Sequence, residues 1–522
     1  MINKKKILIF ILLVFIIFSG CFGGRNYDVL KLAIDSDPTT LDPALGVDVV
    51  SGRLDALIFN NLVKYNYENK IVSDLAKSWE IMDDNKTYIF WLKEGVKFSN
   101  GREVTADDVV YSFKRVLDPR ILSPRTWVLD HIMGAKEFIR GKTKEIEGLK
   151  TLSKYKLEIK LKDVYAPFLS LLTMPQAAIV PKEVAEQYGK DFSENVIGTG
   201  PFILKEWVRD DHITFEANKN YFEGPPKIKK LEYRIIREPL TILSEFEMGN
   251  LDIIDVPSSE FLKYYNNPKY KKNIVSNVGL NIYYIGFNCQ KKPFDNSDVR
   301  KAIASAIDKK NIINTIKKNK AVLAKSPIPP GLLGYDENIN DIKYDYIEAK
   351  RLLEKEKISL NKEYVFLQSK NKEALEVAEI FQEEIKKIGI KIKIEQQEWT
   401  TFKANVDEGY FDAFFISWWA DYPDGENFLS PLFHSKNIGS GGNSTRFKDK
   451  EIDDLIDKAE KEMEISKREA LYKLIQRKVM EKQPIICLWH KIENIIHQPW
   501  VKGYKIYQVY NANKMTQVYI QR

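Results

Sequence analysis

The sequence predicts a mixed fold, of the α/β or α+β class, that is divided into two or three domains. Its 522 residues are more than one hydrophobic core normally organises. A content of 44% hydrophobic and 29% charged residues is typical of a globular protein and shows no signature of disorder. Strand-like and helix-like hydrophobic patterns both occur along the chain, which has no internal repeat and no low-complexity tract.

The N-terminus has the three parts of a secretory signal. Lys4, Lys5 and Lys6 precede an apolar run over residues 7–18, and small residues follow before Cys21. The run is shorter than the roughly 20 residues that span a bilayer, so a signal over residues 1–20 is favoured over a permanent transmembrane anchor.

The residues around Cys21 resemble the lipobox of prokaryotic lipoproteins, in which the cysteine is lipidated and becomes the mature N-terminus. Phe18 stands where lipoboxes more often carry Leu or Val. The alternative is a plain cleaved signal. Either interpretation places the mature chain outside the cytoplasm, and the lipobox also tethers it to the membrane.

Charge and cysteine content narrow the function classes further. The formal charge of +7 falls to about +4 without the three signal lysines, and it is spread over the whole chain, which gives no support to nucleic-acid binding. Apart from Cys21 the chain has Cys289 and Cys487. They are either buried small hydrophobic residues or one disulfide, which an extracytoplasmic compartment permits.

Two helices are marked by their sequence. Thr105 and Asp108 form a capping box ahead of a helix that Asp118-Pro119 ends. Apolar residues over 299–307 recur at the spacing of one helical face, which predicts a helix packed on the core and not a functional site.

The C-terminal half contains a predicted βαβ unit. A short strand over residues 364–367 leads into a helix over 375–388 that Gly389 ends, and alternating isoleucines over 390–394 form the next strand. A further strand over 411–417 opens directly into the aromatic and acidic loop Trp418-Trp419-Ala420-Asp421-Tyr422-Pro423-Asp424-Gly425. Ligands of open α/β sheets bind beyond the carboxyl ends of strands, so this loop is the candidate site.

That loop resembles the Trp-x-Ala-Asp-Tyr stretch of the periplasmic oligopeptide- and dipeptide-binding proteins of ABC importers. The similarity extends in the same order over more than 400 residues. The matching stretches are Leu41-Asp42-Pro43, Leu75-Ala76-Lys77-Ser78-Trp79, Leu92 to Val110, Gly198-Thr199-Gly200-Pro201-Phe202, Asn218 to Phe222, Pro293-Phe294-Asp295 with Asp298-Val299-Arg300, and Pro499-Trp500-Val501.

The resemblance implies an α/β, two-lobed periplasmic-binding-protein fold (type II, cluster C) with an extra third domain. The first lobe would combine residues 21–59, 185–283 and 492–522, the extra domain would span 60–184, and the second lobe would span 284–491. The lobes would close on the ligand by a hinge motion that contacts on both lobes favour.

The resemblance also assigns roles to residues. Asp421 aligns with the aspartate that pairs with the α-amino group of the ligand, although by itself an Asp before Pro423 would more commonly cap a turn. Several other residues fall at or beside positions that line the cleft in the family, while core packing is the commoner fate of any one aromatic side chain. These candidate lining residues are Val49, Tyr283, Tyr284, Trp399, Trp418 and Trp419.

The basic positions depart from the family pattern. Arg125 replaces a tyrosine near the ligand's amino end, where it either holds a ligand carboxylate or pairs with Asp421 in the empty site. Phe415 and Glu373 replace an arginine and a histidine at the carboxylate end. Lys317 keeps a basic group there, with a solvated face as the alternative. The chain therefore defines the amino end of a peptide ligand better than its carboxyl end.

The function that these observations predict is capture of a small ligand, a di- or oligopeptide, for delivery to a membrane permease and its ATPase subunits. The alternatives within the family are a nickel chelate and an oligosaccharide. An enzyme, for example a glycosidase that uses Asp421 and Asp424, and a structural surface lipoprotein are the rivals outside it. We expect no metal site, because the five histidines show no metal-site spacing. We expect no catalytic residues either, because the sequence has no Gly-x-Ser-x-Gly or His-Glu-x-x-His motif. The protein is expected to be a monomer without a cofactor.

Overall fold

The structure is a computed structural model that describes residues 28–257, 260–318, 320–356 and 362–521. The predicted signal and Cys21 lie outside the described residues. Among the helices of the described ranges, none is both long and apolar enough to cross a membrane.

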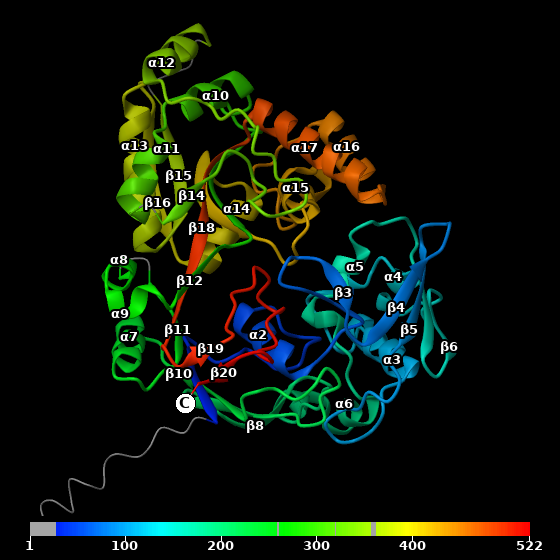
Figure 1. Cartoon of the computed structure of the whole chain (residues 1–522). Helices are drawn as coiled ribbons and strands as arrows, with labels where there is room; N and C mark the ends of the chain where they lie inside the picture. Colours follow the sequence, from blue (N-terminus) through cyan, green and yellow to red (C-terminus); the bar gives the residue numbers. More distant parts are fainter. Residues whose placement is uncertain (1–27, 258–259, 319, 357–361, 522) are drawn as a thin grey trace, which may run out of the picture.

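One large mixed sheet runs through the molecule (Figure 1). Its strand order is β16-β15-β17-β13-β18-β11-β1-β10-β9-β8, and β12 and β14 also pair with β18. The bounds of its strands are β1 (Val29–Ile34), β8 (Phe202–Val208), β9 (His212–Ala217), β10 (Lys230–Ile235), β11 (Ile253–Asp255), β12 (Ile274–Val278), β13 (Asn281–Phe287), β14 (Ala321–Leu323), β15 (Glu363–Ser369), β16 (Lys391–Gln397), β17 (Ala413–Trp419) and β18 (Ile485–His497).

The long strand β18 joins two halves of this sheet. Its first residues pair with β13 and β14, and its last residues pair with β12 and β11. The chain crosses in the other direction between β12 and β13, close to the point where β18 changes partners. In the described residues the halves are thus connected by two adjacent segments, a narrow link of the kind that hinge motions use.

The first half packs α2 (Val49–Ile58) and the Gly198–Phe202 region on β1, β8, β9 and β10. Asp48 begins α2 because its carboxylate accepts a hydrogen bond from the Ser51 N–H at 2.8 Å. Smaller elements complete this half: α7 (Pro239–Glu247), α8 (Phe261–Tyr265), α9 (Pro268–Lys271), and the paired strands β19 (Val501–Lys502) and β20 (Tyr519–Ile520).

The second half contains the predicted βαβ unit, which is confirmed: β15 and β16 are parallel and α13 (Lys372–Lys386) connects them. One core of this half contains residues of α10 (Ser297–Ser305), α11 (Lys309–Ile312), α12 (Tyr346–Lys355) and α13, and the stripe over 299–307 is buried there as predicted. The other core contains residues of α14 (Trp399–Glu408), α15 (Glu426–Phe433), α16 (Lys450–Lys461) and α17 (Ile465–Lys482).

A separate antiparallel sheet of order β4-β5-β7-β6 lies beside these halves (Figure 1). Its strands are β4 (Ala76–Ile81), β5 (Thr87–Leu92), β6 (Leu149–Ser153) and β7 (Lys156–Lys160), and its helices are α3 (Ala106–Leu117), α4 (Ala135–Ile139) and α5 (Phe168–Leu171). The next helix, α6 (Lys182–Tyr188), places Val184 and Ala185 in the core of the first half. The hairpin of β2 (Val63–Tyr65) and β3 (Ile71–Ser73) precedes the four-stranded sheet. The capping box of α3 is confirmed, since the Asp108 carboxylate accepts the Thr105 N–H at 2.9 Å.

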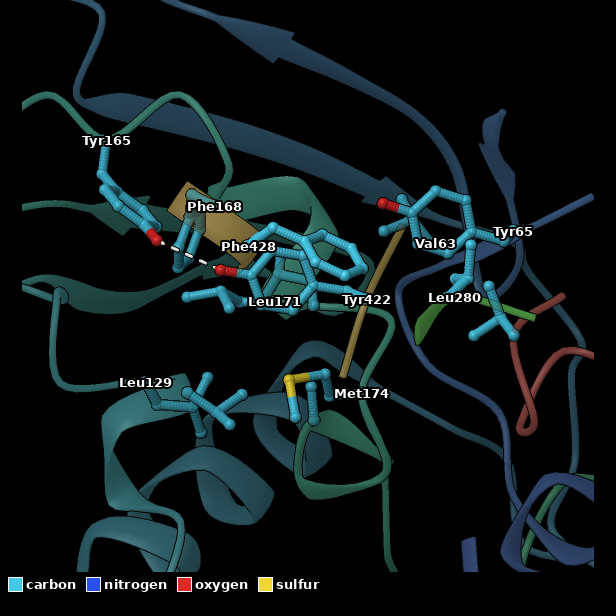
Figure 2. Close-up of a cluster of buried hydrophobic side chains, with 14 of the residues drawn as sticks. Val63, Tyr65, Leu129, Tyr165, Phe168, Leu171, Met174, Leu280, Tyr422 and Phe428 are labelled. Carbon is cyan, nitrogen blue, oxygen red and sulfur yellow. Dashed lines mark hydrogen bonds between the residues drawn. The ribbon is translucent and has the colours of Figure 1, made fainter. Parts of the chain in front are cut away.

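This four-stranded region packs directly on the second half. Figure 2 shows the shared apolar cluster, in which Phe168 and Leu171 of α5 lie with Tyr422 and Phe428. The hydroxyls of Tyr165 and Tyr422 lie 3.4 Å apart across the contact. The second half therefore touches both neighbouring parts of the molecule.

The structure corrects two details of the sequence analysis. The strand predicted over 411–417 is β17, which begins at Ala413 and extends through Trp419, so both tryptophans belong to the strand. The disulfide alternative is wrong, because Cys289 and Cys487 are both free thiols. Burial raises the pKa of Cys289 to about 11 and that of Cys487 to about 12.

Candidate functional site

A cavity of about 440 Å³ lies where the two halves and the four-stranded region meet. Residues of α2 and of the ends of β1, β10, β11 and β18 form its wall on the first half, together with the C-terminal stretch 504–515. The end of β17 and the loop after it close the cavity from the second half, and Arg125 reaches it from the four-stranded region. Its volume falls in the range of about 300–1,000 Å³ that is typical of small-ligand pockets.

Asp421 and Arg125 form an ion pair in the wall of this cavity. The Arg125 Nη1 lies 2.7 Å from Asp421 Oδ1, and both side chains are largely buried. The Arg125 Nη2 also donates to the Val47 carbonyl at 3.1 Å. Burial opposes the charge of Arg125, but Asp421 outweighs it, so the pKa of Arg125 is raised. The structure thus shows the second of the two roles predicted for Arg125, pairing with Asp421.

The loop that carries Asp421 is fixed by its own hydrogen bonds. The Asp421 backbone N–H donates to Asn427 Oδ1 at 2.9 Å. The Asp424 carboxylate accepts the Glu426 N–H at 2.9 Å, at the start of α15. Asp424 therefore has a structural task, whereas the Asp421 carboxylate is held toward the cavity.

Of the predicted lining residues, Val49 and Trp419 lie in the cavity wall with Asp421 and Arg125. Trp418 does not, because successive side chains of a strand point to opposite faces. Its Nε1 donates to the Asn427 carbonyl at 2.7 Å, and its ring packs on the core of the second half. Trp419 remains 40% exposed at the cavity.

Tyr283, Tyr284 and Lys317 also lie away from the cavity wall. Tyr284 is 2% exposed and belongs to the core on one face of β13, while Tyr283 on the other face stacks on Trp489 at 5.3 Å between ring centroids. Lys317 is 3% exposed on its side chain, so the solvated-face alternative is wrong. Its ammonium pairs with Glu373 at 2.5 Å and lies over the Tyr283 ring. Burial lowers the pKa of Lys317 although Glu373 opposes this.

Trp399 is the first residue of α14 and is 58% exposed. Its ring contacts Phe402 of the same helix, with 5.8 Å between centroids, and it does not lie in the cavity wall. Phe415, which replaces a family arginine, is buried in the other core of the second half. The basic groups that the sequence suggested for a ligand carboxylate are therefore either remote from the cavity or already paired.

Three charged residues that were not predicted from the sequence, Arg53, Asp255 and Glu493, also line the cavity. Arg53 follows Val49 by one helical turn on α2, so the predicted position of Val49 already implied it. Asp255 is the last residue of β11, and ligands of open α/β sheets bind beyond the carboxyl ends of the strands. The Arg53 Nη1 lies 3.8 Å from Asp255 Oδ2.

The C-terminal stretch was also missed as a part of the site. Tyr504, Tyr507 and Tyr510 line the cavity from this stretch, which has no regular secondary structure that a pattern could reveal. The Tyr510 ring lies so close to Gly52 of α2 that a Cβ there would stand 2.3 Å from the ring. Gly52 therefore allows this tyrosine to approach the helix. No group of three possible metal-ligating side chains occurs within the described part of the chain.

The model of the "Bacterial extracellular solute-binding proteins, family 5 Middle" matches residues 70–440 of the chain. The chain belongs to this family of solute-binding proteins. The family consists of substrate-binding proteins of transport systems, and the predicted recognition and the two-lobed α/β fold are confirmed. The first and second halves described above are called the first and second lobe from here on.

Named relatives cover nearly the whole chain of this solute-binding protein. It is 32% identical to heme-binding protein A of Haemophilus influenzae, over 90% of this chain and 88% of the relative. It is 31% identical to the dipeptide-binding protein of Pseudomonas aeruginosa, over 91% of this chain and 92% of the relative. Among solved structures it matches the periplasmic binding protein DppA from Helicobacter pylori in complex with the peptide STSA, with a TM-score of 0.78, 28% identity and coverage of 95% and 98%.

Proposed function

We propose that the protein captures short peptides outside the cytoplasm and delivers them to the permease of an ABC importer. The observation that supports this most is Asp421, a carboxylate held in a cavity between two lobes and paired with a charge from the other side. Peptide binding by relatives such as the dipeptide-binding protein and the DppA complex supports the same ligand class.

The α-amino group of the peptide pairs with Asp421 in this proposal. A largely buried carboxylate needs a positive partner, since an unpaired buried charge is costly. Arg125 supplies that partner in the structure at 2.7 Å. A peptide ammonium replaces it at Asp421, and Arg125 then turns to ligand carbonyl or carboxylate oxygens.

Contacts on both lobes make capture a closure event. The cavity wall combines Val49 of the first lobe with Trp419 and Asp421 of the second lobe. A ligand that touches both sides binds the closed state better than the open state, and this difference in affinity shifts the population toward closure. Trp419 and the tyrosines of stretch 504–515 supply aromatic surface that accepts varied side chains.

The size of the cavity favours short peptides over long ones. A volume of about 440 Å³ lies toward the lower end of the range for ligand pockets. Di- and tripeptides are therefore the expected ligands.

The remaining parts of the proposal concern the location and the assembly. Cys21 is lipidated after cleavage of residues 1–20, and the lipid tethers the protein to the membrane. The protein is a monomer that carries no catalytic group or cofactor, and the ATPase subunits on other chains supply the energy of transport. Of the predicted ligand contacts we retain Asp421, Arg125, Val49 and Trp419.

A fluorescence titration tests this function, because Trp419 lies in the cavity wall. The purified chain is titrated with di- and trialanine, maltotriose, a nickel–histidine complex and hemin. Saturable quenching or enhancement by the peptides is expected, and Trp419→Phe should reduce the signal more than the affinity. A response to the sugar, the nickel complex or hemin alone would contradict peptide capture.

A further inference from the structure

Besides the Asp421–Arg125 pair, a second group of charged side chains lines the same cavity. It consists of Arg53, Asp255 and Glu493. Asp255 of β11 pairs with Ile495 of β18, and Glu493 precedes Ile495 by two residues on the same face of the sheet. Asp255 and Glu493 are therefore diagonal neighbours, for which separations of about 7–8 Å are usual.

The charges of this cavity do not balance. Its described wall contains three carboxylates, Asp255, Asp421 and Glu493, but only the two guanidinium groups of Arg53 and Arg125. Arg125 is hydrogen bonded to Asp421, so Asp255 and Glu493 share Arg53. The nearby Lys491 does not line the cavity, and its ammonium lies over the Trp419 ring, 5.7 Å from the centroid.

Arg53 holds its acidic neighbours only loosely. Its closest charged contact is the 3.8 Å approach to Asp255, which is longer than a hydrogen bond. Burial raises the pKa of Glu493 and Asp255 adds to this, while Arg53 and Lys491 only partly offset it. The residues that line the cavity thus carry one more negative than positive charge.

Aromatic rings around the same group favour a cation independently. Tyr233 and Tyr504 line the same cavity. The faces of aromatic rings attract ammonium and guanidinium groups. Acidic and aromatic groups together are the chemistry that recognises an organic cation.

We propose that Asp255 and Glu493 form a subsite for a cationic side chain of the ligand, so that the preferred peptides carry a lysine or arginine. This inference rests on the proposed function of peptide capture. A peptide with a neutral side chain brings no net charge to the cavity, whereas one with a basic side chain balances the third carboxylate. Arg53 moves away from the acidic pair as the cation enters.

Calorimetric titrations of the full chain with matched tripeptides test the proposal. Three sets replace the second or the third residue of trialanine, with lysine, with norleucine, which has a similar length without the ammonium, or with glutamate. The lysine peptide with the basic residue in the subsite should bind at least tenfold more tightly than its norleucine partner. In Asp255→Asn and Glu493→Gln chains this ratio should fall below threefold.

The control is Glu481→Gln, which removes an exposed carboxylate that does not line the cavity and should leave the ratio unchanged. Thermal melts show that each variant is folded. Equal binding of lysine and norleucine peptides overturns the subsite but not peptide capture. If the glutamate-containing tripeptide binds most tightly, the cation subsite is wrong and Arg53 forms an anion site instead. If none of the tripeptides binds, the proposed function fails, and the subsite fails with it.

Discussion

Asp421 and Arg125 stand 296 residues apart in the sequence and 2.7 Å apart at their charged atoms. The position of Asp421 could be predicted from the residues around it, because the loop follows a strand of an α/β sheet. The place of Arg125 near the ligand could be predicted only from the family resemblance. Its ion pair with Asp421 is seen only in the structure. Arg53 was not predicted, although it follows Val49 by one turn of the same helix and therefore shares its face.

At the scale of single residues, Asp421→Ala should reduce the affinity for a short peptide by about 30-fold or more. Removal of one member of a desolvated, hydrogen-bonded charge pair typically costs about 2–5 kcal/mol. Isothermal titration with trialanine measures the loss. Asp454→Ala is the control, since Asp454 pairs with Lys450 on the surface of α16. Equal losses in both variants would show that Asp421 does not contact the ligand.

At the scale of elements, the local signals predicted α3, α10 and the βαβ unit correctly. Each has a capping group, a buried stripe or a terminating glycine within its own sequence. The end of β17 was not predictable in this way, because Trp418 and Trp419 fit a loop or a strand equally well. Both tryptophans belong to the strand because Trp418 pairs with Ile282 and Trp419 with Asn281 of β13. Successive side chains of a strand point to opposite faces, so only Trp419 lines the cavity.

Asp108→Ala should lower the free energy of unfolding by about 1–3 kcal/mol. The Asp108 carboxylate accepts the Thr105 N–H that begins α3 and also two hydrogen bonds from Arg102, at 2.6 and 3.0 Å. Urea denaturation followed by circular dichroism measures the change. The exposed neighbour Asp107 provides the control, and Asp107→Ala should cost only about 0.5 kcal/mol. A similar loss in the two variants would contradict the importance of the capping box.

At the scale of the whole molecule, contacts between parts distant in sequence determine the site. The cavity combines both lobes, the four-stranded region and the C-terminal stretch, and no local pattern encodes such an assembly. The two-lobed fold was nevertheless predictable, because the family motifs occur in order over most of the chain. Tyr284 shows the limit of that approach, since a position beside the cleft in the family is core in this chain.

The contact between the second lobe and the four-stranded region should weaken as the pH rises. Glu426 is buried there with Tyr165, Tyr422, Asp424 and Glu460 around it. Burial, and then repulsion by Glu460, raises the pKa of Glu426 to about 8. A carboxyl whose pKa is raised in the folded state stabilises that state fully below its ordinary pKa, and this contribution is lost as the pH rises toward 8.

The expected result is a free energy of unfolding that falls between pH 5 and pH 8, by about 1 kcal/mol per pH unit. Glu426→Gln mimics the protonated carboxyl and should flatten this dependence. Urea denaturation at pH 5, 6, 7 and 8 measures both chains. Glu469→Gln on α17 is the control, because Glu469 pairs with Lys473 at the surface. Parallel curves for Glu426→Gln and the unmodified chain would assign the pH dependence to other groups.

The central claim is that the cavity at Asp421 holds a short peptide. Native mass spectrometry tests it most directly, on the purified chain after incubation with an equimolar mixture of trialanine, maltotriose, nickel–histidine and hemin. We expect one adduct, with the mass of the tripeptide, that is absent from the Asp421→Ala chain. An adduct of only the sugar, the nickel complex or hemin, or a tripeptide adduct that survives Asp421→Ala undiminished, would contradict it.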